Sequence, residues 1–191
     1  MRCPTRREVL QALAAASVQG LVRRASAADV SVPVGLQTTL IGKIAAFDRA
    51  FRARSGQTAR LIVAHEDGDS ARIGHQVANA LKEMGDIAGL SKTVETFEWS
   101  SPAALVSLVR ARPTALVYLS VGLETEAPAL AAALAGTDLL TVGATGAIAE
   151  RGACVGFELE EGKAQIYVNL RVAKAQKVDF RAELLHLVKL V

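Results

Sequence analysis

The most informative segment of this sequence is Glu150-Arg-Gly-Ala-Cys-Val-Gly-Phe-Glu-Leu-Glu-Glu-Gly-Lys-Ala-Gln-Ile-Tyr-Val-Asn-Leu170. Two segments of strand-forming residues, 155–159 and 164–168, flank a turn that contains glycine, and this pattern predicts a β-hairpin. Asn169 follows the hairpin and predicts the start of a helix, because asparagine is an efficient N-cap. The end of the chain, 182–191, is rich in leucine and valine and predicts a final helix that runs to the last residue.

The residues before the hairpin predict helices and short apolar strands in alternation. An apolar residue recurs every three or four positions from Leu36 to Phe51, which is typical of one helix ending near Ser55. Further helices are expected near 70–84, 102–109 and 124–134, and strands at 59–64, 93–99, 115–121 and 139–142. This order predicts an α/β fold: a three-layer sandwich with a mostly parallel sheet flanked by helices, ending in the β-hairpin and a helix.

The first 27 residues have the layout of an export signal. Arg6-Arg7 precede a modest apolar run, and Ala25-Ser-Ala27 places small residues before the expected cleavage point, as in a twin-arginine signal. We therefore expect cleavage near Ala27, a periplasmic location, and one domain over residues 28–191. Residues 1–27 carry five arginines and one glutamate, or +4, so the +3 of the whole chain leaves −1 for that domain. This balance argues against nucleic acid as a partner.

Sites for chemistry are few. His65-Glu-Asp-Gly-Asp69 could hold Mg²⁺, or it could be a solvated turn in which Asp69 or Ser70 caps the next helix. Gly143-Ala-Thr-Gly146 could cradle a phosphate, or it could be a tight turn. Ser100 and Ser120 have no evident histidine base. We predict no catalytic residue, no cofactor site and no metal site, and hence a protein that is not an enzyme.

The mature domain retains one cysteine. Cys3 would leave with the signal, and Cys154 lies in an apolar, strand-like run. We interpret Cys154 as a buried core residue rather than a redox group. The leucines and valines of 182–191 cover more than one helical stripe, so this segment is either a docked helix or an apolar interface for another protein.

The segments 139–143, 152–157, 161–163, 166–170 and 182–188 together resemble the YfiR-like family of periplasmic proteins. The chain departs from the usual family pattern at Gly143-Ala144, Ala153 and Tyr167, and it has only Cys154 where some members have cysteine pairs. The resemblance implies a small, non-catalytic α/β domain that represses a membrane signalling enzyme from outside. In the best-known system that enzyme is a diguanylate cyclase, and the output is cyclic di-GMP and biofilm control.

Two functional hypotheses follow. The first is an exported regulator that binds the periplasmic domain of an inner-membrane diguanylate cyclase or sensor histidine kinase. Its predicted partner-binding residues are Phe157, Ile166, Tyr167, Leu187 and Val191. The alternative is a periplasmic small-ligand-binding domain that resembles half of a solute-binding protein, with the ligand near Glu66, Ser120 and Thr145. The partner's identity and a homodimer are left open.

Overall fold

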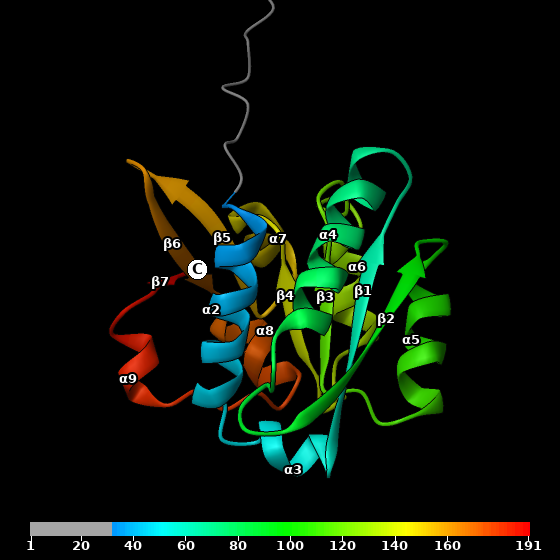
Figure 1. The fold of residues 1–191 in the computed structure, drawn as a ribbon, viewed down its shortest axis with the longest axis horizontal. Coiled ribbons are helices and arrows are strands. Elements are labelled where there is room, and N and C mark those ends of the chain that lie inside the picture. The colour runs from blue at the N-terminus through cyan, green and yellow to red at the C-terminus, as the bar shows by residue number, and fades with distance from the viewer. Residues whose placement is uncertain (1–31) are drawn as a thin grey trace, which may run out of the picture.

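A seven-stranded sheet forms the centre of the computed structural model, which describes residues 32–191 (Figure 1). Its strands are β1 (Thr58–His65), β2 (Ser91–Glu98), β3 (Leu116–Leu119), β4 (Leu140–Gly143), β5 (Val155–Glu160), β6 (Lys163–Val168) and β7 (Lys189–Leu190). Their order across the sheet is β2-β1-β3-β4-β5-β6-β7. The expected signal segment, with Cys3, lies outside the described residues.

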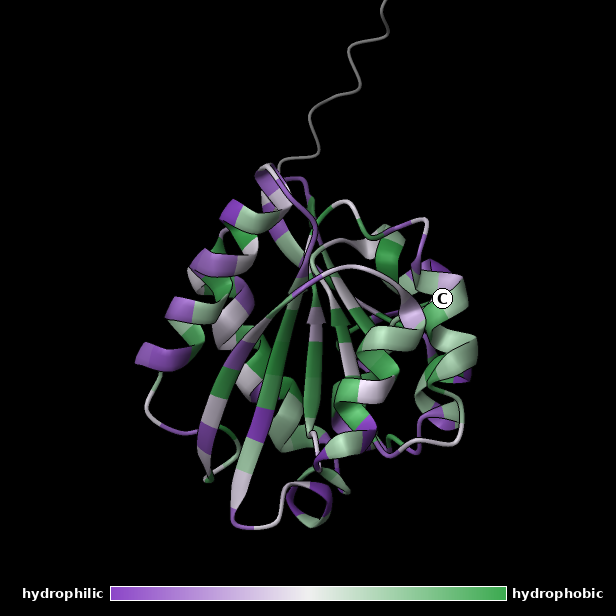
Figure 2. Cartoon of the chain, turned by 90° about the vertical axis from the view of Figure 1, so that its right-hand side faces the viewer, coloured by the Kyte–Doolittle hydropathy of each residue, from purple (hydrophilic) through white to green (hydrophobic). Residues whose placement is uncertain are grey.

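The first five strands in this order are parallel, and they explain the apolar runs in the sequence. Each residue of β3 and β4 is buried, as expected for parallel strands covered on both faces. Figure 2 shows these strands as the hydrophobic centre, with helices on either side. Strand β6 pairs with β5 in the antiparallel direction, and β7 pairs with β6 in the parallel direction. The predicted mostly parallel α/β sandwich is confirmed.

Helices cover both faces of the sheet. They are α2 (Val34–Phe47), α3 (Phe51–Ser55), α4 (Asp69–Glu83), α5 (Pro102–Ala111), α6 (Ala127–Ala133), α7 (Gly146–Arg151), α8 (Leu170–Ala175) and α9 (Ala182–Leu185). Helix α2 packs beside α4 in front of the sheet in Figure 1, and α5 packs beside α6 on the opposite face. The predicted cap of α8 is present, because Asn169 accepts a hydrogen bond from a backbone N–H of the first turn, and Ser101 caps α5 in the same way.

Two helix predictions were wrong. The helix expected from Leu36 to Ser55 breaks at Asp48, which has extended backbone angles and whose carboxylate accepts a hydrogen bond from the N–H of Ala50. The helix expected over 182–191 is only one turn long and gives way to β7. In strand form the last residues pair with β6, and the N–H of Val191 donates to the carbonyl oxygen of Val168 at 3.0 Å.

The β5–β6 hairpin confirms the opening prediction, and its turn follows from the sequence. Glu160 pairs with Lys163, so Glu161 and Gly162 form a two-residue loop. Both have positive φ, 50° and 76°, as a type I′ turn requires. This turn matches the right-handed twist of the strands, and glycine adopts such angles without steric penalty.

Two other glycines, Gly152 and Gly156, are needed because backbone passes against them. A Cβ on Gly152 would lie 2.2 Å from the carbonyl oxygen of Ala127, and a Cβ on Gly156 would lie 2.2 Å from that of Thr145. Both distances are far shorter than a van der Waals contact. The missing side chain of Gly152 therefore lets α6 approach the end of α7 closely. The missing side chain of Gly156 lets the residue before α7 approach β5 in the same way.

Candidate functional site

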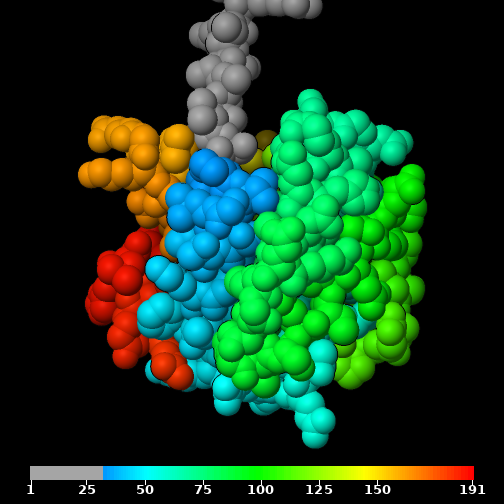
Figure 3. All heavy atoms as spheres, in the orientation of Figure 1, coloured from blue at the N-terminus to red at the C-terminus, as the bar shows by residue number. Residues whose placement is uncertain are grey.

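An apolar patch lies at the end of the chain, where β7 forms the edge of the sheet. Its members are Leu187, Leu190 and Val191, which are 71%, 51% and 41% exposed, and we call them the C-terminal patch. Figure 3 shows the last residues, in red, on the surface beside α2. These three large aliphatic side chains lie within five residues of one another, and exposed apolar side chains that gather on a surface are typical of a protein interface.

The five predicted partner-binding residues are not all on this surface. Leu187 and Val191 are exposed, and Ile166 is half-buried. Phe157 and Tyr167 are both buried, but on opposite faces of the hairpin, because Tyr167 pairs with Gly156 and Phe157 pairs with Ile166. On the Tyr167 face, Gly146 of α7 lies against the Tyr167 ring. The pattern of alternating apolar residues could not show this, because it does not reveal which faces of a hairpin a helix covers.

A polar network attaches β7 to the hairpin. The Lys189 ammonium donates to Glu160 Oε1 at 3.0 Å and to the Tyr167 hydroxyl oxygen at 2.9 Å, and it lies 4.7 Å from the centre of the Tyr167 ring. The Tyr167 hydroxyl also donates to Glu160. This bond raises the pKa of Tyr167 to about 12, and the bonds from Tyr167 and Lys189 hold the pKa of Glu160 below its usual value. The network keeps β7 paired, and so holds Leu190 in position.

A buried ion pair anchors the segment that leads into the C-terminal patch. Asp48 Oδ2 lies 2.8 Å from Arg54 Nη2, and both side chains are almost completely buried. The other oxygen of Asp48 accepts the N–H of Asp179 at 3.3 Å. Next to this contact, the N–H of Arg181 donates to the carbonyl oxygen of Phe47. Burial raises the pKa of Asp48 although Arg54 opposes the shift.

The alternative ligand site lies where the parallel strands end. The order β2-β1-β3-β4-β5 reverses direction between β1 and β3, the point at which open α/β sheets commonly bind ligands. Here the candidate hydroxyls have partners within the chain. Ser120 Oγ donates to the carbonyl oxygen of Ser70 at 2.8 Å, and Thr145 Oγ1 donates to Glu124 at 3.3 Å while capping α7. Glu66 Oε2 lies next to Gly122.

The segment from His65 to Asp69 is a turn that leads into α4. Neither Asp69 nor Ser70 caps that helix; Ser70 Oγ instead accepts the N–H of Glu66 at 3.0 Å. The His65 and His75 rings lie 4.8 Å apart. Within residues 32–191, no group of three or more histidine, cysteine, aspartate or glutamate side chains could hold a metal ion.

Cys154 is buried between Thr141 and Gln176. The Thr141 hydroxyl donates to Gln176 Oε1 at 2.9 Å, and the Cys154 thiol donates to the same oxygen at 3.3 Å. Burial raises the pKa of the Cys154 thiol to about 11, so at neutral pH the group is a thiol rather than a reactive thiolate. The interpretation of Cys154 as a core residue agrees with its complete burial.

Among known protein families, the one described as YfiR/HmsC-like matches residues 36–189, which is most of the chain. The chain belongs to the YfiR/HmsC-like family. The suspected family is thereby confirmed, and this family is a regulatory, non-catalytic group of periplasmic proteins. No curated protein sequence matches this family member. Among the described residues, no helix is long and apolar enough to cross a membrane.

Solved structures share the fold of this YfiR/HmsC-like chain at low sequence identity. An ABC domain from Streptococcus pneumonia in complex with L-Trp has a TM-score of 0.59 and 12% identity and covers 83% of the chain. CD0873, a substrate binding protein with adhesive properties from Clostridium difficile, has a TM-score of 0.52 and 11% identity and covers 74% of the chain. A conserved domain protein from Vibrio cholerae has a TM-score of 0.52 and 14% identity and covers 85% of the chain. The chain spans 62%, 57% and 60% of these three proteins. The fold therefore resembles that of periplasmic binding proteins.

Proposed function

We propose that this protein is an exported regulator that binds the periplasmic domain of an inner-membrane signalling protein, either a diguanylate cyclase or a sensor histidine kinase. The observation that carries the proposal is the C-terminal patch in a member of a regulatory family. Covering its three aliphatic side chains would remove apolar area from water, which favours association at roughly 25 cal/mol per Å². In this proposal Ile166 lies at the margin of the interface, and the buried Phe157 and Tyr167 do not contact the partner directly.

The edge strand adds a second kind of contact. Among the strands of residues 32–191, none lies next to β7 on the side away from β6, and an extended segment of the partner could pair there. Only two residues form this strand, so the apolar side chains supply the affinity and the backbone sets the register.

Recovery of a membrane partner tests the proposal. Purified protein is incubated with detergent-solubilised membranes, and captured proteins are identified by mass spectrometry. Leu187→Asp should abolish recovery of the signalling protein, because burying an unpaired carboxylate in an apolar interface is strongly unfavourable. Leu36→Asp is the matched control, since Leu36 is also a partly exposed leucine but lies in the first turn of α2. Equal recovery by wild type and Leu187→Asp would show that the C-terminal patch does not bind the partner.

Export is a separate part of the proposal. We infer that residues 1–27 direct the chain to the periplasm through the Arg6-Arg7 pair and are cleaved near Ala27. In cells, Arg6→Lys with Arg7→Lys should leave the precursor in the cytoplasm. The mass of the periplasmic protein should correspond to a chain beginning at residue 28. A periplasmic protein of full length would contradict this inference.

A periplasmic small-ligand-binding domain is the second candidate function. The shared fold with a protein solved with L-Trp and with a substrate binding protein favours it. The ligand would lie at the switch point near Glu66, Ser120 and Thr145. Thermal unfolding with a panel of amino acids tests this candidate, because a ligand at 1,000 times its Kd stabilises the folded state by about 4 kcal/mol. An unchanged melting temperature across the panel would count against it.

A further inference from the structure

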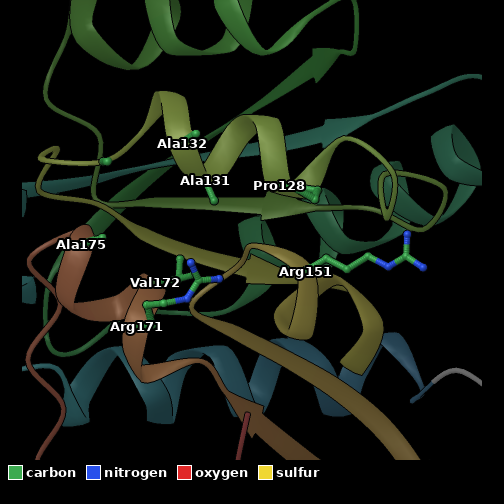
Figure 4. A pocket seen from close by; sticks show the side chains of 8 residues that line it. Pro128, Ala131, Ala132, Arg151, Arg171, Val172 and Ala175 are labelled. Atoms are coloured by element: carbon green, nitrogen blue, oxygen red, sulfur yellow. The ribbon is translucent and has the colours of Figure 1, made fainter.

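A groove between α6, α7 and α8 lies away from the C-terminal patch. Its volume is about 260 Å³, and alanine side chains of α6 and α8 line much of it, together with Pro128 and Val172 (Figure 4). These small side chains, such as Ala132 and Ala175, leave space that larger residues would fill. The volume lies just below the range of about 300–1,000 Å³ for pockets that hold drug-sized ligands, so a small molecule would fit.

The two sides of the groove are fixed with respect to each other. At one end, the N–H of Gly136, which follows α6, donates to the carbonyl oxygen of Ala175 in α8 at 2.8 Å. At the other end, the carbonyl oxygen of Ala127 in α6 lies directly against Gly152, where no side chain separates them. Because α6 is held at both ends, the groove cannot close by a simple shift of this helix, and it is formed before any ligand arrives.

The charge around the groove is positive. Arg151 and Arg171 lie at its rim, and no carboxylate is among its lining residues. Among residues 32–191, neither arginine has an ion-pair or side-chain hydrogen-bond partner. In Figure 4 the Arg171 side chain lies beside Val172 and extends toward α6. The Arg151 side chain begins at the other end of the groove, near Pro128, and extends away from the other lining residues. Arg171 is thus the cation placed to contact a bound molecule.

We propose that this groove binds a small amphipathic anion, a carboxylate on a short hydrocarbon or aromatic body, with its carboxylate held by Arg171. The planar guanidinium matches a carboxylate in a bidentate arrangement, and the alanine-lined floor receives the apolar body. Arg151 adds positive potential from the opposite end. The proposal is independent of the partner-binding function, because it uses α6, α7 and α8 rather than β7.

Titration with octanoate, followed by calorimetry and by amide chemical shifts, tests the proposal. Octanoate should bind saturably and shift the amides of Ala132 and Ala175, and the neutral octanamide should bind more weakly. Arg171→Gln should raise the Kd for octanoate by about tenfold or more, which corresponds to loss of a charge-assisted hydrogen bond. Ala132→Phe should abolish binding by filling the groove.

Arg110→Gln is the control, since Arg110 is exposed on α5 outside the groove. It should bind octanoate like the wild type. Equal Kd values for octanoate and octanamide, or wild-type affinity in Arg171→Gln, would overturn the proposal. So would a dimer in sedimentation experiments that Ala132→Phe dissociates, because a second copy of the chain would then occupy the groove.

Discussion

Replacing Arg54 by methionine tests how the chain holds its C-terminal segment. The Arg54 side chain is buried between two carboxylates, with Nη2 2.8 Å from Asp48 Oδ2 and Nε 2.9 Å from Asp138 Oδ1. Arg54→Met keeps a long apolar side chain but leaves Asp48 buried without its cation. Removing one partner of a buried pair costs about 3–5 kcal/mol, a large part of the roughly 5–15 kcal/mol by which domains are stable.

Urea unfolding followed by fluorescence measures this change, because Trp99 is the single tryptophan. The matched variant is Asp48→Asn with Arg54→Met, which removes both charges. The asparagine oxygen can still accept the N–H groups of Ala50 and Asp179, so the double variant should be more stable than Arg54→Met. Hydrogen exchange near Asp179 should be faster in Arg54→Met than in the double variant.

The pH dependence has a definite sign. Burial already raises the pKa of Asp48, and loss of Arg54 removes the interaction that lowers it. The folded Arg54→Met protein therefore binds a proton more tightly than the unfolded chain, and its stability deficit should shrink as pH falls toward the unfolded pKa of about 4. A deficit below about 1 kcal/mol at pH 7, or a double variant no more stable than Arg54→Met, would show that Asp48 does not depend on Arg54 as its buried partner.

Three further predictions concern the core and the sheet. Gly152→Ala should destabilise the protein by about 3 kcal/mol in urea unfolding, since the new Cβ would overlap backbone of α6 that cannot move freely; an unchanged midpoint would show that the contact is not tight. Hydrogen bonds from Arg60 lower the pKa of Glu95, so the stability that Glu95 provides is present above pH 4–5 and is lost as pH falls through the lowered pKa. Glu95→Gln should therefore unfold more easily than wild type at pH 7 but almost equally at pH 3; a constant difference would contradict this. The Cys154 thiol should not react with a thiol reagent at pH 8 until urea unfolds the chain, and rapid reaction of the native protein would contradict its burial.

Local sequence patterns predicted most of the fold. Apolar runs such as 139–142 predicted the buried strands, and the turn at Glu161-Gly162 predicted the hairpin, because both depend on neighbouring residues alone. The break at Asp48 could not be predicted, since it depends on Arg54 and on Asp179, which is 131 positions further along the chain. The helical pattern of 36–51 continues through the break and conceals it.

The candidate site was predicted less completely. The sequence left open whether 182–191 is a docked helix or an interface, and Leu187 and Val191 are exposed in the structure. The pairing of β7 with β6 was missed, since the Leu-rich end also fits a helix, and the contacts that distinguish the two, such as that of Lys189 with Glu160, are long-range. Burial of Tyr167 depends on α7, which the hairpin sequence does not encode. The groove beside Arg171 likewise depends on how three separate helices meet.

Photo-cross-linking in living cells tests most directly whether the C-terminal patch binds a membrane partner. A photo-reactive amino acid is placed at position 187 in one strain and at position 36 in another, and adducts are identified by mass spectrometry. An adduct with an inner-membrane signalling protein is expected from position 187 and none from position 36. Absence of such an adduct from position 187, or an equal adduct from position 36, would contradict the assignment of the C-terminal patch as the partner-binding surface.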